Sequence, residues 1–450
     1  MNAPFDITSR QRRLTIMFLF VMGVFNYIDR TIISILQVPI KAELRLSDTQ
    51  LGLLTGLAFA ALYVFSAIPI SRIADRSSRK IVIIAAMTVW SVMTAMSAFA
   101  SSFLLLLLCR MGVAVGESGS VPATHSTLAD LYPPHKRARA IAIWALCLPF
   151  GMIVGYLAAG RLAEALGWRL TFLAIGGAGV AVAPLAMLCM KEPSRGRFDA
   201  SSAHHGTGDF KSAFLILWRI KTYRYLVAGG AVHAFVQYSM MLWNAPFYSR
   251  VHGVSLTEVS FYLAALYGVG GAVGIYVGGW LADRLARRGM SWQLLVPAIA
   301  ILIMMPLAML QYLVASPALS VVIGVLPSAL VVFYLAPIVA VPMLVVGPHM
   351  RAFASAVMTV TFNLVGLGLG PLATGVISDA FIKHFGMADD SLRYALIVVL
   401  LPSLLSSLLF WRAARWLPGE MLPQQVGDDG QSIVQQRGED GQTISKAKPA

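Results

Sequence analysis

The sequence predicts an all-α membrane protein with twelve transmembrane helices in two bundles of six and with both termini in the cytoplasm. Hydrophobic residues occupy 58% of the 450 positions and charged residues only 12%, and the mean hydropathy is +0.73. Soluble domains carry about 25% charged residues. Long apolar runs recur along the chain, and basic residues gather in every second connection between them. Together these observations exclude an ordinary soluble enzyme, a disordered chain and a secreted disulfide scaffold.

Each apolar run is long enough to cross the bilayer, which requires about 20 residues in a helix. Several runs follow one another with almost no loop, so consecutive helices must be antiparallel neighbours. The twelve predicted spans are 14–37, 48–71, 80–101, 103–128, 138–161, 169–190, 223–248, 257–282, 292–314, 318–346, 351–380 and 391–416.

The connections alternate between rich and poor in Lys and Arg. Three arginines lie in 10–13, four basic residues in 72–80 and seven in 191–224. Positive residues remain on the cytoplasmic side of a membrane, which predicts cytoplasmic termini for an even number of spans. Because the net charge of +14 is scattered between spans rather than gathered in a stripe, nucleic acid is not an expected partner. Short loops favour a bacterial inner (plasma) membrane.

The chain divides into five predicted regions. One long polar connection separates the two sets of six spans and ends in an amphipathic piece, 210–223. The tail is rich in Gln, Gly and Asp, a composition typical of disorder. The regions are a cytoplasmic N-terminus 1–13, an N-terminal bundle 14–190, a cytoplasmic loop 191–222, a C-terminal bundle 223–416 and a disordered cytoplasmic tail 417–450.

The two halves contain similar segments in the same order. Residues 73–76 (IADR) match 281–284 (LADR), and 155–160 (GYLAAG) match 370–375 (GPLATG). Same-direction repeats predict two bundles related by an axis along the membrane normal, with a cavity between them near the midplane. This is the architecture of an alternating-access carrier.

Enzyme activity is not expected, and neither is a cofactor or a metal. No Ser-His-Asp, Cys-His or paired-carboxylate set stands in a catalytic context, and no Cys and His have metal-ligand spacing. The glycines of 366–375 lie inside an apolar run and lack the Lys-Ser/Thr ending of a phosphate loop. They predict close helix packing instead.

Two loop segments carry a family resemblance. Residues 71–80 read SRIADRSSRK and 279–288 read GWLADRLARR. Both resemble the Gly-x-x-x-Asp-Arg-x-Gly-Arg-Arg/Lys signature of the major facilitator superfamily, although the first copy has serine at both glycine positions. The resemblance implies a twelve-helix carrier and a gating motif at these corners. Its residues here are Asp75, Arg76, Arg79, Asp283 and Arg284.

Within that superfamily the chain is similar to the Spinster subfamily. The similarity rests on 26–30 (NYIDR), on Arg110 followed by Glu117-Ser118, and on 129–133 (ADLYP). It covers most of the N-terminal half and is weaker in the C-terminal half. The resemblance implies carriage of lysophospholipids or sphingosine-phosphate-like lipids, in part coupled to protons.

Four ionisable residues stand out inside predicted spans: Asp29 and Arg30 in the first, Arg110 and Glu117 in the fourth. Charges in hydrocarbon are costly and usually functional. Arg110 and Glu117 are seven residues apart, so they share a helix face about 10 Å apart. We predict that Asp29 and Glu117 carry protons, and that Arg30 and Arg110 provide counter-charge or bind an anionic headgroup. The alternative is a static ion pair that only fixes the fold.

The C-terminal half has no acidic residue in the middle of a span. A charged wall that faces a largely apolar wall suits an amphiphile. The predicted cavity residues are Asn26, Tyr27, His233, Gln237, Trp243 and Asn363, although packing in the core is the simpler role for each.

The expected function is therefore secondary active transport of a lipid-like amphiphile by alternating access, with proton coupling through buried carboxylates. The expected partners are this substrate, protons and the lipid bilayer, and a monomer is expected. Other possibilities remain open: a multidrug or organic-anion exporter of the same fold, a facilitator without protons, and a receptor that has lost transport.

Overall fold

The computed structural model describes residues 7–195, 210–347, 350–388, 390–422, 424–426 and 432–434. Eleven helical runs in these ranges are long and apolar enough to cross a membrane. One run, Pro134–Cys189, has 56 residues, or about 84 Å at 1.5 Å per residue. The hydrocarbon core is only about 30 Å thick. The backbone of this run breaks at Gly167, where φ is 78°. The run therefore holds two spans, and the prediction of twelve is confirmed.

The N-terminal bundle contains the first six spans. Several are built from consecutive helical segments, including a π-helix (η1) and a 3-10 turn (η2). The elements are α1 (Ser9–Leu44), α2 (Asp48–Gly52), η1 (Leu53–Leu57), α3 (Ala58–Arg76), α4 (Arg79–Met96), η2 (Ser97–Phe99), α5 (Phe103–Ser118), α6 (Ser120–Leu131), α7 (Pro134–Ala145) and α8 (Cys147–Cys189).

The C-terminal bundle contains the other six spans, preceded by the short helix α9. Two further π-helices, η3 and η5, interrupt its eighth and eleventh spans. The elements are α9 (Phe210–Arg219), α10 (Lys221–Val251), α11 (Leu256–Leu263), η3 (Ala264–Gly270), α12 (Gly271–Ala286), α13 (Trp292–Leu313), α14 (Pro317–Leu330), α15 (Leu335–Val345), α16 (Arg351–Thr361), η5 (Phe362–Leu369), α17 (Gly370–Phe385), α18 (Ser391–Leu400) and α19 (Pro402–Glu420).

Local sequence signals explain where several spans begin and end. Ser47 caps α2, and Gln50 completes a reciprocal capping box. Ser78, Ser102 and Ser255 cap later helices through their hydroxyl groups. Gly386 ends α17 in the left-handed region, with φ 66°, which a glycine adopts without steric cost.

The long connection and the tail depart in part from their predicted limits. The amphipathic piece 210–223 is divided, because α9 ends at Arg219 and α10 begins at Lys221. The last span continues past the predicted limit of 416, since α19 runs to Glu420. In the described part of the predicted disordered tail, β1 (Gln424–Val426) pairs antiparallel with β2 (Ser432–Val434). Residues 423, 427–431 and 435–450 of the tail lie outside the described residues.

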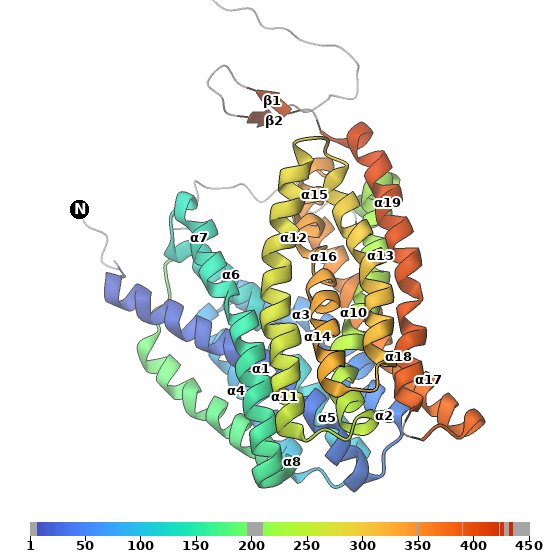
Figure 1. Cartoon of the computed structure of the whole chain (residues 1–450). Helices are drawn as coiled ribbons and strands as arrows, with labels where there is room; N and C mark the ends of the chain where they lie inside the picture. Colours follow the sequence, from blue (N-terminus) through green and yellow to red (C-terminus); the bar gives the residue numbers. More distant parts are fainter. Residues whose placement is uncertain are drawn as a thin grey trace, which may run out of the picture.

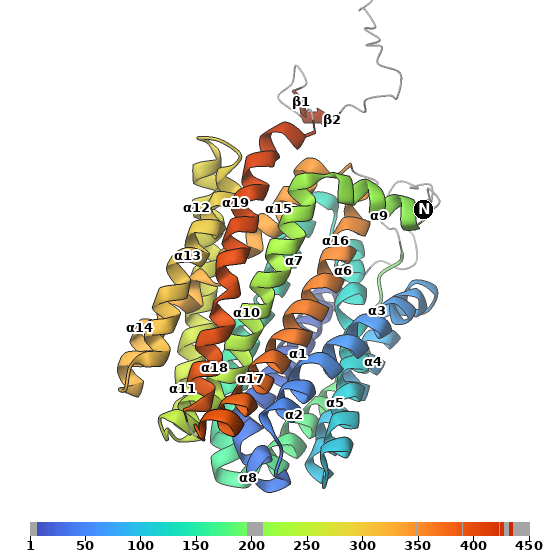
Figure 2. The ribbon, with the colours of Figure 1, turned by 90° about the vertical axis from the view of Figure 1, so that its right-hand side faces the viewer.

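The two bundles stand side by side, and α1 is inclined to the upright helices α12 and α19 of the C-terminal bundle (Figure 1). Helix α9, the end of α19 and the strands β1 and β2 of the tail lie at the same end of the molecule in Figure 2, and we call this the termini end. The opposite end, called here the far end, carries the turns around residues 45–47, 167 and 252–255. An even number of spans places both chain ends on one side, as predicted from the sequence.

The bundles touch each other along their far halves. The segments that pack across the boundary include α2 with α17, α8 with α11 and η3, α1 with α10, and η5 with η1 and α3. At the termini end, Arg79 forms an ion pair with Asp130 and the Lys221 N–H donates to Glu420, each within its own bundle. The molecule is therefore held shut at the far end.

Glycines allow this close approach, as their position inside apolar runs predicted. At Gly375, an added Cβ would meet the backbone of Asp48 in the other bundle, and at Gly160 it would meet Ser260. Small residues at such places bring helix backbones together. The three π-helices lie in the same contact regions, where i→i+5 geometry often marks a functional segment.

Candidate functional site

The structure brings the four predicted intramembrane charges together between α1 and α5. Asp29, Arg110 and Glu117 are buried, with exposed fractions of 1%, 2% and 0%. Arg30 Nε lies 2.8 Å from Glu117 Oε2, and the Arg30 side chain retains 21% of its exposure. The two helices thus place the Arg30–Glu117 ion pair in the middle of the N-terminal bundle. The charged groups of Asp29 and Arg110 lie near it but form no ion pair of this kind with each other.

Asp29 and Arg110 are not joined as directly as Arg30 and Glu117 are. The Asp29 carboxylate accepts a hydrogen bond of 2.8 Å from Thr94 Oγ1, a partner that was not predicted from the sequence. Its charged neighbours are Glu117 and Arg110. Arg110 Nε and Nη1 and Glu117 Oε1 are buried with no hydrogen-bond partner. A buried, unsatisfied charged donor is costly, so this cluster has unused capacity to bind an anion.

Aromatic rings surround the two arginines. The Cζ atoms of Arg30 and Arg110 lie 5.7 and 5.3 Å from the centre of the Phe59 ring, and Arg30 Cζ lies 5.1 Å from that of Tyr63. Ring faces attract cations, and more strongly where water is excluded. Phe59 and Tyr63 therefore hold the guanidinium groups in place without neutralising them.

A cavity of about 30 Å³ lies between the bundles beside these arginines. Arg30 and Arg110 lie on its N-terminal wall together with Ile33, Thr55 and Phe59, and the C-terminal wall is Tyr238, Met241, Leu242 and Leu367. The charged wall and largely apolar wall predicted from the sequence do face each other here. The volume suffices for about one water molecule, so a larger ligand requires the walls to move apart.

Two predicted cavity residues of the first span lie inside the N-terminal bundle instead. Asn26 and Tyr27 line a separate cavity of about 20 Å³ beside Trp90 and Trp144. Asn26 Nδ2 and Trp90 Nε1 are buried there without a partner. The space is large enough for one water molecule, which would satisfy both donors.

The predicted cavity residues of the C-terminal bundle do not line the cavity between the bundles in this conformation. His233 is fully buried, and its Nε2 donates to the carbonyl of Val331 over 2.6 Å. Trp243 is also fully buried and donates to the carbonyl of Pro371 over 3.0 Å. Both residues contact their own bundle because a buried polar group in a bilayer must find a partner within the protein.

The remaining two polar candidates are partly exposed. Gln237 Oε1 accepts a hydrogen bond of 2.7 Å from Tyr334, and Asn363 Nδ2 donates to the carbonyl of Thr359 over 2.8 Å. Each therefore has a partner within the C-terminal bundle.

The first copy of the predicted gating motif is divided between a buried and an exposed part. Arg79 is buried, forms an ion pair with Asp130, lies 3.6 Å from Glu192 and donates to Ser126 Oγ over 3.0 Å. Asp75 and Arg76 are exposed. All of these contacts are inside the N-terminal bundle, so a gating role for the motif stays a prediction.

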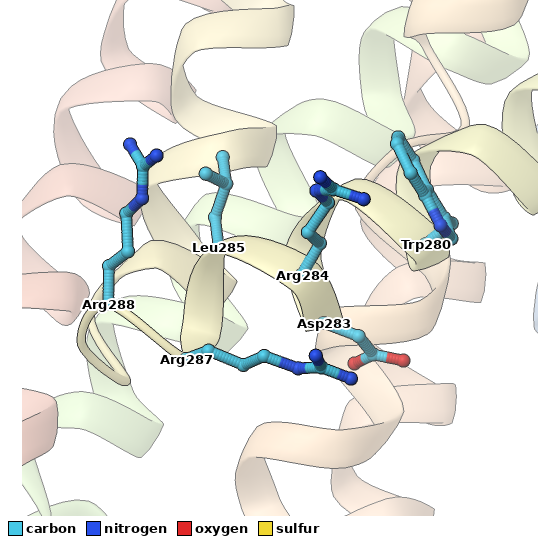
Figure 3. A pocket seen from close by; sticks show the side chains of 6 residues that line it. All are labelled: Trp280, Asp283, Arg284, Leu285, Arg287 and Arg288. Atoms are coloured by element: carbon cyan, nitrogen blue, oxygen red, sulfur yellow. The ribbon is translucent and has the colours of Figure 1, made fainter.

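The second copy lines a surface hollow of about 480 Å³ at the end of α12 (Figure 3). Asp283 and Arg284 are both exposed, and Arg284 Cζ lies 5.3 Å from the centre of the Trp280 ring. In Figure 3 the Arg287 side chain extends toward Asp283, while Arg284 and Arg288 point to the opposite side of the helix. Asp283 and Arg284 are therefore accessible from the surface, as Asp75 and Arg76 of the first copy are.

Among the described residues, no group of three or more His, Cys, Asp and Glu side chains is placed to hold a metal ion.

A polar network at the far end was not predicted from the sequence. The buried carboxylate of Asp48 accepts from Lys41, from Arg250 Nη1 at 2.9 Å and from Ser378 Oγ at 2.6 Å. The carboxylate of Asp379 accepts from the backbone N–H groups of Asp48 and Thr49 at 3.0 and 2.7 Å. We call this network the far-end latch, because it joins α2 of one bundle to α10 and α17 of the other.

Two sequence signals could have pointed to the latch: the run Ser47-Asp48-Thr49-Gln50, which is typical of a helix start, and Asp379, an acidic residue near the end of the predicted span 351–380. Neither signal reveals the partners, since Arg250 and Asp379 are 202 and 331 positions away from Asp48.

Replacing Asp379 by alanine is expected to weaken closure of the far end. The substitution leaves the N–H groups of Asp48 and Thr49 without their acceptor, and each unsatisfied group costs about 1–3 kcal/mol. About 1.4 kcal/mol corresponds to a tenfold change in a population ratio. Spin labels at Ala42 and Lys383, one on each bundle, should therefore report a larger share of long distances in the D379A protein.

The matched control is Glu43→Gln, which removes an exposed ion pair of 2.8 Å with Arg169 inside one bundle. Such a pair contributes only about 0–1 kcal/mol, so the distance distribution should not change. An unchanged distribution in D379A would show that the latch does not hold the bundles together.

Comparison with known proteins adds family evidence to this geometry. A family model described as Major Facilitator Superfamily matches residues 19–371. An "MFS-type efflux pump" of Mycolicibacterium smegmatis is 33% identical over 396 residues, covering 88% of this chain and 91% of the relative. "Protein spinster homolog 3" of Danio rerio is 25% identical over 452 residues, covering 95% and 90%.

Two solved structures of the same kind of protein are also similar to this chain. They are crystal structures of a bacterial homolog to the human lysosomal transporter Spinster in inward-facing conformations, one unoccupied and one occupied. Their TM-scores to this chain are 0.85 and 0.84, each at 29% identity, and they cover 93% of this chain and 100% of their own.

Proposed function

This chain belongs to the major facilitator superfamily, within which it is a Spinster-like transporter, and we propose that it carries a lipid-like amphiphile of the lysophospholipid or sphingosine-phosphate type by alternating access. The observation that supports this substrate class is the cavity between the bundles. Its N-terminal wall presents Arg30 and Arg110, and its C-terminal wall is formed by Tyr238 and apolar side chains. An anionic headgroup would bind the arginines, and the acyl chain would lie against the opposite wall.

Arg110 is the headgroup ligand that we favour most. Two of its nitrogens are buried without an acceptor, whereas Arg30 already binds Glu117. A phosphate oxygen at this position would satisfy donors that the protein leaves unpaired, and a planar guanidinium group binds phosphate in a bidentate manner. Because the cavity now holds about one water molecule, binding of the headgroup must accompany a separation of the walls.

Proton coupling is the second part of the proposal. It follows from competition between Glu117 and an anionic headgroup for the Arg30 guanidinium group. An anionic headgroup that approaches Arg30 displaces Glu117 from its 2.8 Å ion pair. A buried carboxylate that loses its cation is stabilised by binding a proton. Asp29, which already lacks a direct ion pair, is the second proton carrier. Substrate binding and proton binding thus favour the same conformation of the transporter. A ligand shifts the equilibrium between two conformations by the difference in its affinity for them.

The orientation is proposed from the charge pattern. The basic residues of 10–13, 72–80, 191–195 and 219–224 belong to the termini end, which we assign to the cytoplasm by the positive-inside rule. The far end is shut by the latch, so this conformation would face the cytoplasm; the two similar bacterial structures are described as inward-facing. We assign the protein to the bacterial inner membrane and, since one chain holds both bundles, to a monomer.

Uptake into proteoliposomes tests the substrate class. Vesicles that contain the protein and an imposed pH gradient should accumulate radiolabelled lysophosphatidylglycerol above protein-free vesicles. Unlabelled sphingosine 1-phosphate should compete, while benzoate, a small organic anion without a long chain, should not. Absence of uptake, or equal competition by benzoate, would reject a lipid-like substrate.

One finding favours a second candidate, export of drugs or organic anions. The Mycolicibacterium relative at 33% identity is described as an efflux pump. This candidate predicts that everted vesicles accumulate ethidium in a gradient-dependent manner and that lysophosphatidylglycerol does not compete. The same vesicle preparation therefore distinguishes the two candidates.

A further inference from the structure

A hollow of about 460 Å³ lies outside the transport site, at the termini end of the C-terminal bundle. Its lining residues are Tyr225 from the start of α10 and Arg412, Arg415 and Trp416 from the end of α19. These two helices pack along each other, and both reach the level of α9 (Figure 2). The hollow is on the surface of one bundle, so it is separate from the cavity between the bundles.

Cations and aromatic rings alternate around this hollow. Lys221 Nζ lies 3.6 Å from the centre of the Trp416 ring, and Arg224 Cζ lies 5.4 Å from that of Tyr225. Arg415 Cζ lies 5.0 Å from the centre of the Trp411 ring, and Trp411 and Trp416 are each 43% exposed. The rings orient the cations but leave their charge uncompensated.

The nearest acidic residue does not neutralise this group. The carboxylate of Glu420 accepts hydrogen bonds from the backbone N–H groups of Lys221 and Thr222 at 2.9 and 2.7 Å, at the start of α10. Among the described residues, Lys221, Arg224, Arg412 and Arg415 form no ion pair with a carboxylate. The hollow therefore concentrates positive charge that is available to an anion from outside.

Helix α9 indicates the depth of this hollow relative to the bilayer. It crosses the ends of the spans rather than running along them (Figure 2), and a single residue, Ile220, separates it from α10. Its Leu215, Ile216 and Trp218 are 51%, 50% and 41% exposed. A helix with such an apolar face lies at the boundary between headgroups and acyl chains, where Trp and Tyr also accumulate. The cations around the hollow are thus at headgroup depth.

We infer that this hollow is a binding site for the headgroup of an anionic phospholipid of the surrounding leaflet. The Arg412 and Arg415 guanidinium groups would bind the phosphate, since Arg forms paired hydrogen bonds with phosphate oxygens. Trp411 and Trp416 would contact the glycerol and the first part of the acyl chains. Basic pockets at helix ends on the cytoplasmic side bind anionic headgroups in this manner. The lipid would be a bound component of the protein and not its cargo.

Native mass spectrometry of the purified full-length protein tests this site without any transport measurement. The protein is stripped of lipid, mixed with equal amounts of phosphatidylglycerol and phosphatidylcholine, and the retained lipids are counted. The wild-type protein should retain phosphatidylglycerol preferentially. Removing both charges in R412Q/R415Q should lower this preference about 25-fold, at about fivefold for each basic residue at a membrane surface.

Two further variants separate a specific site from general charge. R10Q/R13Q removes two exposed arginines at the same end of the other bundle and should retain the wild-type preference. R412K/R415K keeps the charge but not the paired hydrogen bonds, so an intermediate preference is expected. The inference is overturned if R412Q/R415Q keeps the wild-type preference, or if R10Q/R13Q loses as much. It is also overturned if inorganic phosphate alone displaces all the phosphatidylglycerol, because the site would then recognise phosphate without the lipid.

Discussion

Replacement of Glu117 by glutamine is expected to abolish uptake driven by a pH gradient, with a fall of more than tenfold in the initial rate. Glutamine keeps the length of the side chain and an oxygen that still accepts from Arg30, but it binds no proton near neutral pH. The same result is expected for Asp29→Asn, whose amide oxygen still accepts from Thr94. Initial rates of lysophosphatidylglycerol uptake into proteoliposomes, with and without the gradient, measure the effect.

An exchange assay, in which labelled and unlabelled substrate cross the membrane in opposite directions without net proton movement, distinguishes a loss of proton coupling from a loss of substrate binding. Vesicles loaded with unlabelled lysophosphatidylglycerol should still exchange it for labelled lipid in the Glu117→Gln protein, because the substrate site keeps both arginines. Asp390→Asn is the control, since its ion pair of 3.0 Å with Arg393 is 57% exposed on the Asp390 side. If Glu117→Gln and Asp29→Asn both retain full gradient-driven uptake, the carboxylates are not the proton carriers. Loss of exchange as well would assign them to binding or folding.

Replacement of Gly375 by alanine is expected to prevent closure of the far end and to reduce transport more than tenfold. A Cβ at this position would lie 2.7 Å from the carbonyl carbon of Asp48 and even closer to its oxygen. Both atoms belong to the backbone of the other bundle, which cannot rotate aside as a flexible side chain would. The spin-label distance between Ala42 and Lys383 should become longer, since only the separated arrangement of the far end accommodates the methyl group.

Gly177→Ala is the matched control for this steric effect. Gly177 also lies within a long helix, but an added Cβ there meets nothing within 4 Å. Alanine is a better helix former than glycine by about 1 kcal/mol, so the control protein should be at least as stable as the wild type. Normal transport and an unchanged distance in Gly375→Ala would mean that the bundles do not need this close backbone contact.

The charge cluster illustrates how far sequence reasoning reached. Asp29, Arg30, Arg110 and Glu117 were identified because a charged residue inside a long apolar run is visible in the sequence itself. The sequence did not show which of these four residues pair with each other. Arg30 binds Glu117 while Asp29 binds Thr94 of a third helix, and this choice depends on how each helix is rotated about its axis.

The cavity residues show the opposite outcome. His233 and Trp243 were predicted to line the cavity because polar and aromatic groups in apolar spans are often functional. The ring nitrogen of each instead forms a hydrogen bond with a carbonyl group of its own bundle. The C-terminal wall of the cavity is instead formed by Tyr238, Met241, Leu242 and Leu367. Apolar lining residues have no sequence signal that separates them from other apolar residues of the same spans.

By itself, the sequence of this transporter determined the twelve spans, the common side of the two termini, the duplicated motif and the presence of charge within the membrane. Each of these properties follows from the bilayer acting on one segment at a time, through the length of an apolar run and the cost of a charge. Only the tertiary structure decided which charges pair, which residues face each other across the cavity, and that Asp48 joins Arg250 and Ser378 in a latch. Those contacts join residues that are from 65 positions (Asp29 and Thr94) to 330 positions (Asp48 and Ser378) apart, and they depend on helix packing that no single segment specifies.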